Sequence, residues 1–199
     1  MAIADFFQIS VDELLSNEKS EKKQSDYIYE SRTEYDIDGK KNFDIKLGGA
    51  YAVDLKAYHG EKIEVAMFSN VYKNLLADYK VKIDDIKNRI DIDLNRFNEA
   101  SEADAKESLV ITIFIPIKYI GKIELSVNAG TLNITDIENE HIEVNGKISE
   151  VTLQGNKSEI EIDSNLDMQI SVLSHEGALE INQLSATSRL TLPADYRFR

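Results

Sequence analysis

The stretch from Ile123 to Leu192 consists of short units in which apolar residues alternate with polar ones. Successive units start 8 to 11 residues apart. Alternation over three to five residues predicts a strand with one buried face. Two successive units together form a repeat of roughly 20 residues, and a repeat of that length predicts stacked rungs that cover one another. The stretch therefore predicts a β-solenoid. Its units are Ile123/Leu125/Val127, Leu132/Ile134, Ile142/Val144, Val151/Leu153, Ile160/Ile162, Met168/Ile170/Val172, Leu179/Ile181 and Leu190/Leu192.

The residues before this stretch also alternate, from Tyr27 to Leu94. Asp38-Gly39, between two apolar units, predicts a hairpin. The nearly continuous apolar run from Leu109 to Ile115 predicts a central strand that is buried on both faces. Val71, Leu75 and Leu76 fit a short helix, and the polar residues 98–107 predict a mobile loop. The predicted fold class is mainly β, with solenoid repeats from about 109–192 inside a β-rich domain of residues 27–199.

Glycines and polar residues occupy regular places in the repeat. Gly130, Gly146, Gly155 and Gly177 each precede an apolar unit, and glycine permits the positive φ that a sharp corner needs. Between the apolar positions lie residues that we expect on a solvated outer face, namely Asn133, Glu143, Thr152, Glu161, Gln169, Glu180 and Thr191.

The amino-terminal residues 1–15 predict helices, because Ile3, Phe6 and Phe7 share one helical face and Ser10 with Glu13 forms a capping box. Residues 16–26 are polar and charged, as in a linker. The sequence AIADFFQISVDELL at 2–15 resembles the last two helices of an XRE-type helix-turn-helix domain. The resemblance implies a transcriptional regulator that binds DNA only through a domain mostly absent from this chain, and no DNA-contacting residue can be transferred.

A second resemblance covers residues 40 to 199. The pattern IELSVNAGTLNI, which follows an apolar strand ending in Ile115-Pro116, is similar to the bacterial putative-adhesin domain of unknown function. That resemblance implies a β-solenoid of the kind found in cell-envelope-stress proteins and fused behind helix-turn-helix domains. The family supplies no catalytic residues to transfer.

Composition excludes several classes of protein. The formal net charge is −13, which argues against nucleic-acid binding or a polybasic membrane-binding surface in this chain. The chain has no cysteine and hence no disulfide or thiolate site. No apolar run approaches the roughly 18–20 residues of a membrane span, and the start lacks the features of a secretory signal. We therefore expect a cytoplasmic protein, with the cell surface as the alternative.

Residues with catalytic or binding potential are few. His59, His141 and His175 lie in turn-like segments without metal-ligand spacing. The densest carboxylates are Asp84/Asp85 and Asp91/Asp93, and the last two are expected together on an outer face. Neither group forms a catalytic set or a metal site, so we predict no catalytic, cofactor-binding or metal-binding residues. The tyrosines of the first half fit either strand packing or a partner surface: Tyr27, Tyr29, Tyr35, Tyr51, Tyr58, Tyr72 and Tyr79.

These observations lead to one main functional prediction and two alternatives. The main prediction is a non-enzymatic module that serves as the effector or oligomerisation part of a helix-turn-helix transcriptional regulator. The first alternative is an adhesin-like or cell-envelope-associated structural module, and the second is a carbohydrate-active β-helix protein. The end near Leu192 shows no polar cap, which predicts either self-association through the solenoid edge or, as we favour, a natural protein that continues beyond both ends.

Overall fold

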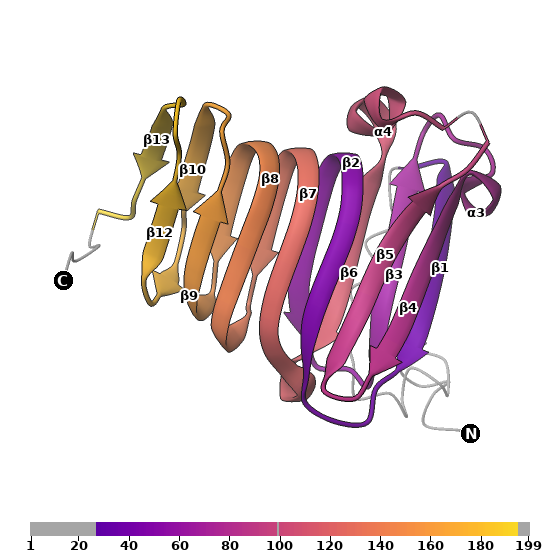
Figure 1. Ribbon diagram of the computed structural model, residues 1–199, viewed down its shortest axis with the longest axis horizontal. Coiled ribbons are helices and arrows are strands. Elements are labelled where there is room, and N and C mark those ends of the chain that lie inside the picture. The colour runs from indigo at the N-terminus through magenta and orange to yellow at the C-terminus, as the bar shows by residue number, and fades with distance from the viewer. Residues whose placement is uncertain (1–26, 99, 195–199) are drawn as a thin grey trace, which may run out of the picture.

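The computed structural model describes residues 27–98 and 100–194. Strands make up most of these residues and form one continuous hydrogen-bonded sheet system, so the predicted mainly β fold is confirmed (Figure 1). The predicted helices of residues 1–15 and the linker of residues 16–26 lie outside the described residues.

The described helices are short and the strands range from 2 to 18 residues. The helices are α3 (Leu75–Asp78), α4 (Glu102–Ser108) and a 3-10 turn (Ile117–Tyr119). The strands are β1 (Tyr29–Asp36), β2 (Lys41–Tyr58), β3 (Lys62–Ser69), β4 (Tyr79–Ile86), β5 (Arg89–Arg96), β6 (Val110–Pro116), β7 (Ile120–Thr135), β8 (Glu138–Gln154), β9 (Asn156–Asp163), β10 (Met168–Val172), β11 (His175–Glu176), β12 (Leu179–Asn182) and β13 (Ser188–Thr191).

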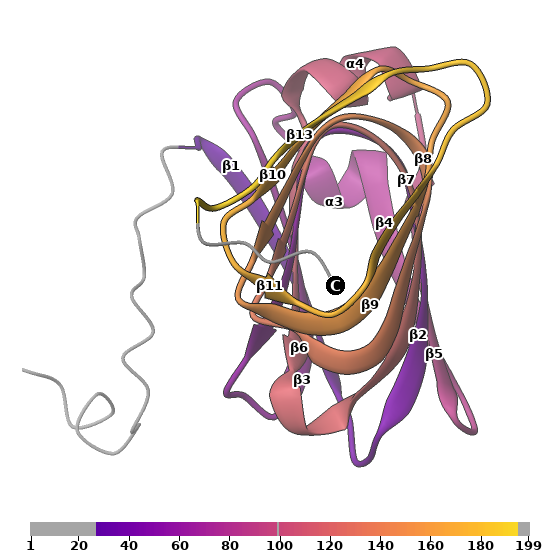
Figure 2. The same ribbon diagram turned by 90° about the vertical axis from the view of Figure 1, so that its left-hand side faces the viewer.

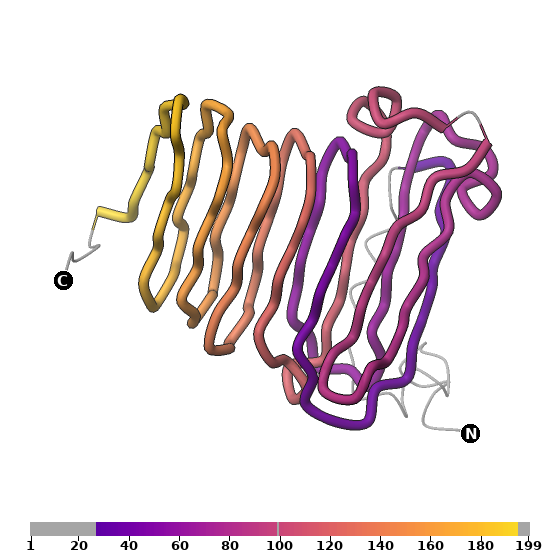
Figure 3. The backbone as a smooth tube through the Cα atoms, in the orientation of Figure 1, coloured from indigo at the N-terminus to yellow at the C-terminus, as the bar shows by residue number. Residues whose placement is uncertain are grey.

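The long strands β2, β7 and β8 each turn a corner, so that each contributes to two facing walls (Figures 2 and 3). The first wall runs in the order β4, β5, β2, β7, β8, β9, β12, and the second runs β1, β3, β6, β2, β7, β8, β10, β13. From β2 onward, neighbours within each wall pair in parallel. Parallel pairing follows from winding, because each circuit of the chain returns in the same direction.

Apolar side chains stack directly between successive coils. In the first wall, Ile123 lies between Phe43 and Ile142, and the stack continues with Ile160. These four side chains are at most 1% exposed. Burying such a side chain stabilises the fold by about 1.5–3 kcal/mol. The second wall repeats the arrangement with Val53, Leu132, Val151, Ile170 and Leu190.

Backbone passes very close to backbone at two corner glycines. A Cβ on Gly146 would lie 1.7 Å from the Val127 carbonyl oxygen, and one on Gly177 would lie 1.9 Å from the Ser158 carbonyl oxygen. Both glycines have positive φ, 146° and 132°. At these two predicted positions, glycine permits the turn and also the close contact with the preceding coil.

The corner that contains Gly177 is also held by a buried amide. The Asn156 side chain, 1% exposed, accepts a hydrogen bond from Ile137 N at 3.0 Å and donates one to Ile134 O at 2.8 Å. Because a buried polar group without partners is costly, these two bonds fix the path of the chain where β8 begins. Sequence periodicity gave no sign of this contact.

Residues 59–119 form an insertion between the first two coils. The coil formed by β2 lies directly beside that of β7, so the stack begins at Lys41 and not near residue 109 as predicted. The predicted strand Leu109–Ile115 corresponds to β6, which lies between β2 and β3 and is almost entirely buried, as expected. The predicted hairpin at Asp38-Gly39 is wrong, because β1 pairs with β3 and not with β2.

The helix α4 replaces the predicted mobile loop at 98–107. Ser101 begins it as an N-cap, with its hydroxyl accepting from Asp104 N at 3.1 Å, and Ala105 is fully buried. The helix contacts β2 at Gly49, where an added Cβ would lie 2.5 Å from Glu102 Cγ. The prediction gave too little weight to the capping serine followed by acidic residues, which is a helix start signal.

Glu102 connects α4 to the second coil. Its carboxylate accepts from Asn128 Nδ2 at 3.0 Å and lies 3.4 Å from Lys106 Nζ and 3.6 Å from an Arg96 guanidinium nitrogen. The Asn128 hydrogen bond, followed by the Lys106 ammonium, lowers the pKa of Glu102. A lowered pKa means that the ionised side chain stabilises the folded state.

We expect Glu102→Gln to reduce stability at neutral pH by less than about 1 kcal/mol, because the group is partly solvated. The contribution of a carboxyl with a lowered pKa is present above its unfolded pKa, about 4.3, and is lost as pH falls through the folded pKa. Urea unfolding of both proteins at about pH 7 and about pH 3 measures this difference. If the two proteins differed in free energy of unfolding by the same amount at both pH values, the stabilising role of the ionised Glu102 would be contradicted.

Candidate functional site: an acidic row across the first wall

Seven carboxylates lie side by side on the outer face of the first wall. Each occupies the same register position on its strand, so neighbours are about 4.8 Å apart in the hydrogen-bonding direction. We call this set the acidic row. In wall order its members are Asp84, Asp91, Asp44, Glu124, Glu143, Glu161 and Glu180.

Cations neutralise the part of the row that precedes the second coil. Lys46 Nζ lies 2.8 Å from Asp44, Arg89 binds Asp91 through two nitrogens at 2.6 and 3.0 Å, and Lys82 pairs with Asp84. The hydrogen bond to Asp44 raises the pKa of Lys46, and that to Asp91 raises the pKa of Arg89. Each cation lies two residues from its carboxylate on the same strand, and so on the same face.

On the later coils, two members of the row have amide partners in place of cations. Asn145 Nδ2 donates to Glu143 at 2.7 Å, and Asn182 Nδ2 donates to Glu161 at 2.9 Å. His141 Nε2 lies 3.9 Å from Glu161. Within the described residues, Glu124 and Glu180 have no hydrogen-bond or ion-pair partner, and both are exposed. The negative charge of the row is therefore concentrated on the later coils.

This arrangement constrains the chemistry of the face. Like charges directly opposite one another destabilise a sheet, so the row opposes folding while it produces a strip of negative potential. The carboxylates project side by side from a flat wall and do not converge, and no group of three or more His, Asp or Glu among the described residues is arranged to hold a metal ion. Such a strip attracts cations and basic surfaces by long-range electrostatics.

The carboxylates singled out from the sequence are only partly brought together. Asp84 and Asp91 lie directly opposite one another in the β4–β5 pair and belong to the row. Asp93 lies opposite Lys82, in the adjoining register position. Asp85 lies opposite the buried Ile90 and binds Lys41 Nζ at 2.7 Å.

The three histidines are not brought into one site. His59 is exposed after β2, and His175 lies in the two-residue strand β11. His141 lies within β8 and not in a turn, so that part of the prediction is wrong.

The tyrosines divide between the two predicted roles, strand packing and a partner surface. Tyr79 is 1% exposed, its ring meets that of Tyr72 edge to face at 5.1 Å, and burial raises the pKa of its hydroxyl. Tyr27 and Tyr58 contact phenylalanine rings, Phe68 and Phe114 respectively. Tyr51, in contrast, is 53% exposed. Packing accounts for most of these contacts.

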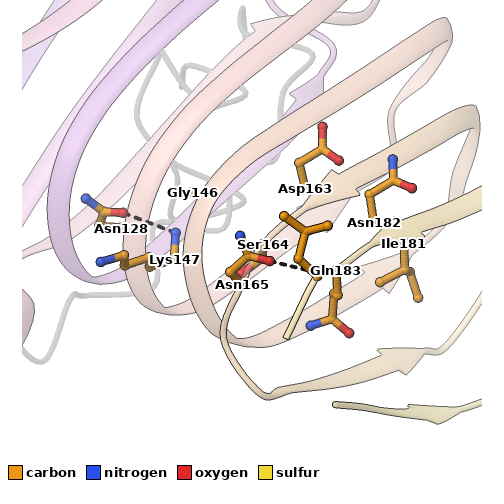
Figure 4. Close-up of a pocket in the computed structure, with 10 residues that line it drawn as sticks. Asn128, Gly146, Lys147, Asp163, Ser164, Asn165, Ile181, Asn182 and Gln183 are labelled. Carbon is orange, nitrogen blue, oxygen red and sulfur yellow. Dashed lines mark hydrogen bonds between the residues drawn. The ribbon is translucent and has the colours of Figure 1, made fainter. Parts of the chain in front are cut away.

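A hollow of about 600 Å³ lies at the corner that contains Gly146 (Figure 4). Amide side chains span its coils: Asn128 Oδ1 accepts from Lys147 N at 3.1 Å, and Asn165 Oδ1 accepts from Leu184 N at 2.9 Å. Asp163 and Asn182 also line it. Because Asn128 and Asn165 are used in holding the coils together, the hollow is a by-product of the corner.

The fold is similar to that of a putative cell adhesion protein from Clostridium sporogenes, with a TM-score of 0.52 and 8% identity over 81% of this chain and 99% of that one. Putative adhesins from Parabacteroides merdae and Parabacteroides distasonis match 81% of this chain and 94% of theirs, at 11% and 6% identity and a TM-score of 0.30. No protein-family model and no curated protein matches the chain. Identity this low establishes similarity of fold alone.

This similarity corrects the functional prediction. The resemblance to the putative-adhesin domain is confirmed at the level of the fold. The prediction of an effector module of a transcriptional regulator is wrong, because the similar structure is that of a putative cell adhesion protein, which agrees with the alternative of an adhesin-like module. Within the ranges that the structure describes, no helix combines the length and the apolar character needed to cross a membrane.

Proposed function

We propose that this chain is a non-enzymatic, adhesin-like structural module that binds a positively charged partner surface through its acidic row. The observation that carries the proposal is the in-register row of seven carboxylates, whose four members on the later coils form no ion pair with a lysine or arginine among the described residues. The name of the similar Clostridium sporogenes protein supports the adhesive role. With this role we propose a location at the cell surface.

A wall of paired strands suits adhesion because its backbone is already ordered. The coils beneath the row are packed by side chains that are at most 1% exposed at Ile123, Ile142 and Ile160. Binding to a preorganised face avoids the entropy cost of ordering loops. An electrostatic contact of this kind accelerates association and weakens with salt.

The test removes three charges from the row. In Glu124→Gln/Glu143→Gln/Glu161→Gln, the amides keep the side-chain shape but remove three of the four negative charges on the later coils. We expect retention of the labelled chain on polylysine-coated surfaces to fall about tenfold at low salt. Wild-type retention should itself fall as salt increases.

A matched control changes the net charge equally away from the row, through Glu107→Gln/Glu150→Gln/Glu176→Gln, all exposed positions. This control should bind as the wild type does. Equal binding by the row variant and the wild type, or release of reducing sugar from a polysaccharide panel, would contradict the proposal. Cleavage of the chain by protease added to intact cells tests the proposed location, since a cytoplasmic chain is protected.

A further inference from the structure

The last described coil ends the stack with two free strand edges. β12 pairs only with β9, and β13 pairs only with β10, so no strand within 27–98 or 100–194 covers the other edge of either. Such an edge presents unpaired N–H and C=O groups. The interior is open there as well, because Leu190 is 40% exposed whereas Ile170, its neighbour in β10, is fully buried.

The two free edges carry opposite charges. Glu180 is exposed at the centre of β12 in the first wall, and Arg189 is exposed at the centre of β13 in the second. Neither has a hydrogen-bond or ion-pair partner among the described residues. The two walls face opposite sides of the coil, so Glu180 and Arg189 of one chain cannot neutralise each other.

An occupant of this end must supply two strand edges at once, separated by the spacing of facing sheets, about 10 Å. It must also be about four residues wide in each wall, because β12 and β13 have four residues each. The other end of the stack does not match, since its edge strands β1 and β4 have eight residues each. A second copy of the same last coil meets both requirements.

We propose that two copies of this chain associate end to end through their last coils, with β12 of each copy pairing antiparallel with β13 of the other. The twofold axis runs parallel to the strands and exchanges the two walls. In one register, Glu180 lies opposite the partner's Arg189 and Leu179 lies opposite the partner's Leu190, so outer charges and inner apolar residues both match. The symmetry forms each pair twice.

This interface is independent of the adhesive role, because it uses the end of the stack and not the centre of the acidic row. Sedimentation equilibrium of the full chain tests it. We expect a concentration-dependent dimer, whose dissociation constant rises about tenfold in Glu180→Arg and in Arg189→Glu. The double variant Glu180→Arg/Arg189→Glu restores the opposite charges and should return the constant to within about threefold of the wild type.

The control is Glu124→Arg, which reverses a charge of the acidic row far from the last coil and should leave the constant unchanged. The absence of cysteine permits a second measurement: a chain with Glu180→Cys mixed with one carrying Arg189→Cys should give a mixed disulfide dimer on oxidation, and neither chain alone should cross-link efficiently.

Three results would overturn the proposal. One is a wild-type chain that remains monomeric at about 100 µM, a concentration at which a weak but specific dimer would be populated. In that case, a chain shortened after Ala194 tells whether residues 195–199 cover the edge. Another is a dimer that is unaffected by either charge reversal. The last is efficient cross-linking by Glu180→Cys alone, which would show that β12 pairs with its own copy.

Discussion

Replacing Gly146 with alanine is expected to destabilise the fold by at least about 3 kcal/mol. The added Cβ would lie 1.7 Å from the Val127 carbonyl oxygen, and this neighbour is backbone that cannot move aside without disturbing the preceding coil. The φ of 146° adds a conformational cost that an L side chain cannot avoid. Urea unfolding followed by circular dichroism measures the change.

Gly39→Ala is the matched control for this substitution. No heavy atom lies within 4 Å of a Cβ built on Gly39, and its φ is not in the positive region. Its stability should stay within about 0.5 kcal/mol of the wild type. If both variants unfolded at the same urea concentration, the corner would tolerate a side chain and the close packing of β8 on β7 would be wrong.

The second large effect is expected at the core position Ile123. Ile123→Ala should cost about 3 kcal/mol, because the fully buried side chain lies between Phe43 and Ile142 and leaves a cavity between two coils. Glu124→Ala, at the next position and facing solvent, should change stability by no more than about 0.5 kcal/mol. Thermal and urea unfolding of the two variants compare the inner and outer faces directly.

A cost below about 1 kcal/mol at Ile123 would contradict the stacked arrangement. A cost at Glu124 comparable to that at Ile123 would also contradict it, because the two positions would then not face opposite sides. The pair therefore tests the alternation of inner and outer residues independently of the corner glycines.

Local alternation was enough to predict the strands from residue 120 onward. The positions expected to face outward, such as Glu143, Glu161 and Thr152, do so. The reason is physical: a residue's face in a strand depends on its parity relative to apolar neighbours. The central strand β6 was predictable because a strand that pairs on both edges and is covered on both faces needs few polar side chains.

The partner of each early strand was not predictable from local pattern. Asp38-Gly39 favours a hairpin between β1 and β2. In the structure, β1 instead pairs with β3, and β2 begins the stack of coils, because these pairings bury apolar side chains that are far apart in the sequence. The acidic row was missed for the same reason. Glu143, Glu161 and Glu180 were recognised as outward residues. Their alignment with Asp44, Asp84 and Asp91 depends on pairing across the insertion of residues 59–119.

That insertion has a consequence for the order in which the protein assembles. Phe43 pairs with Ile123, 80 residues along the chain, whereas Ile123 pairs with Ile142 after only 19. Closing the longer loop costs about 1 kcal/mol more in chain entropy. During refolding of the complete chain, β7 can therefore pair with β8 and the later coils before β2 closes the longer loop onto β7. The first coil in sequence is thus expected to be among the last to dock, and slow refolding should be confined to residues 41–119.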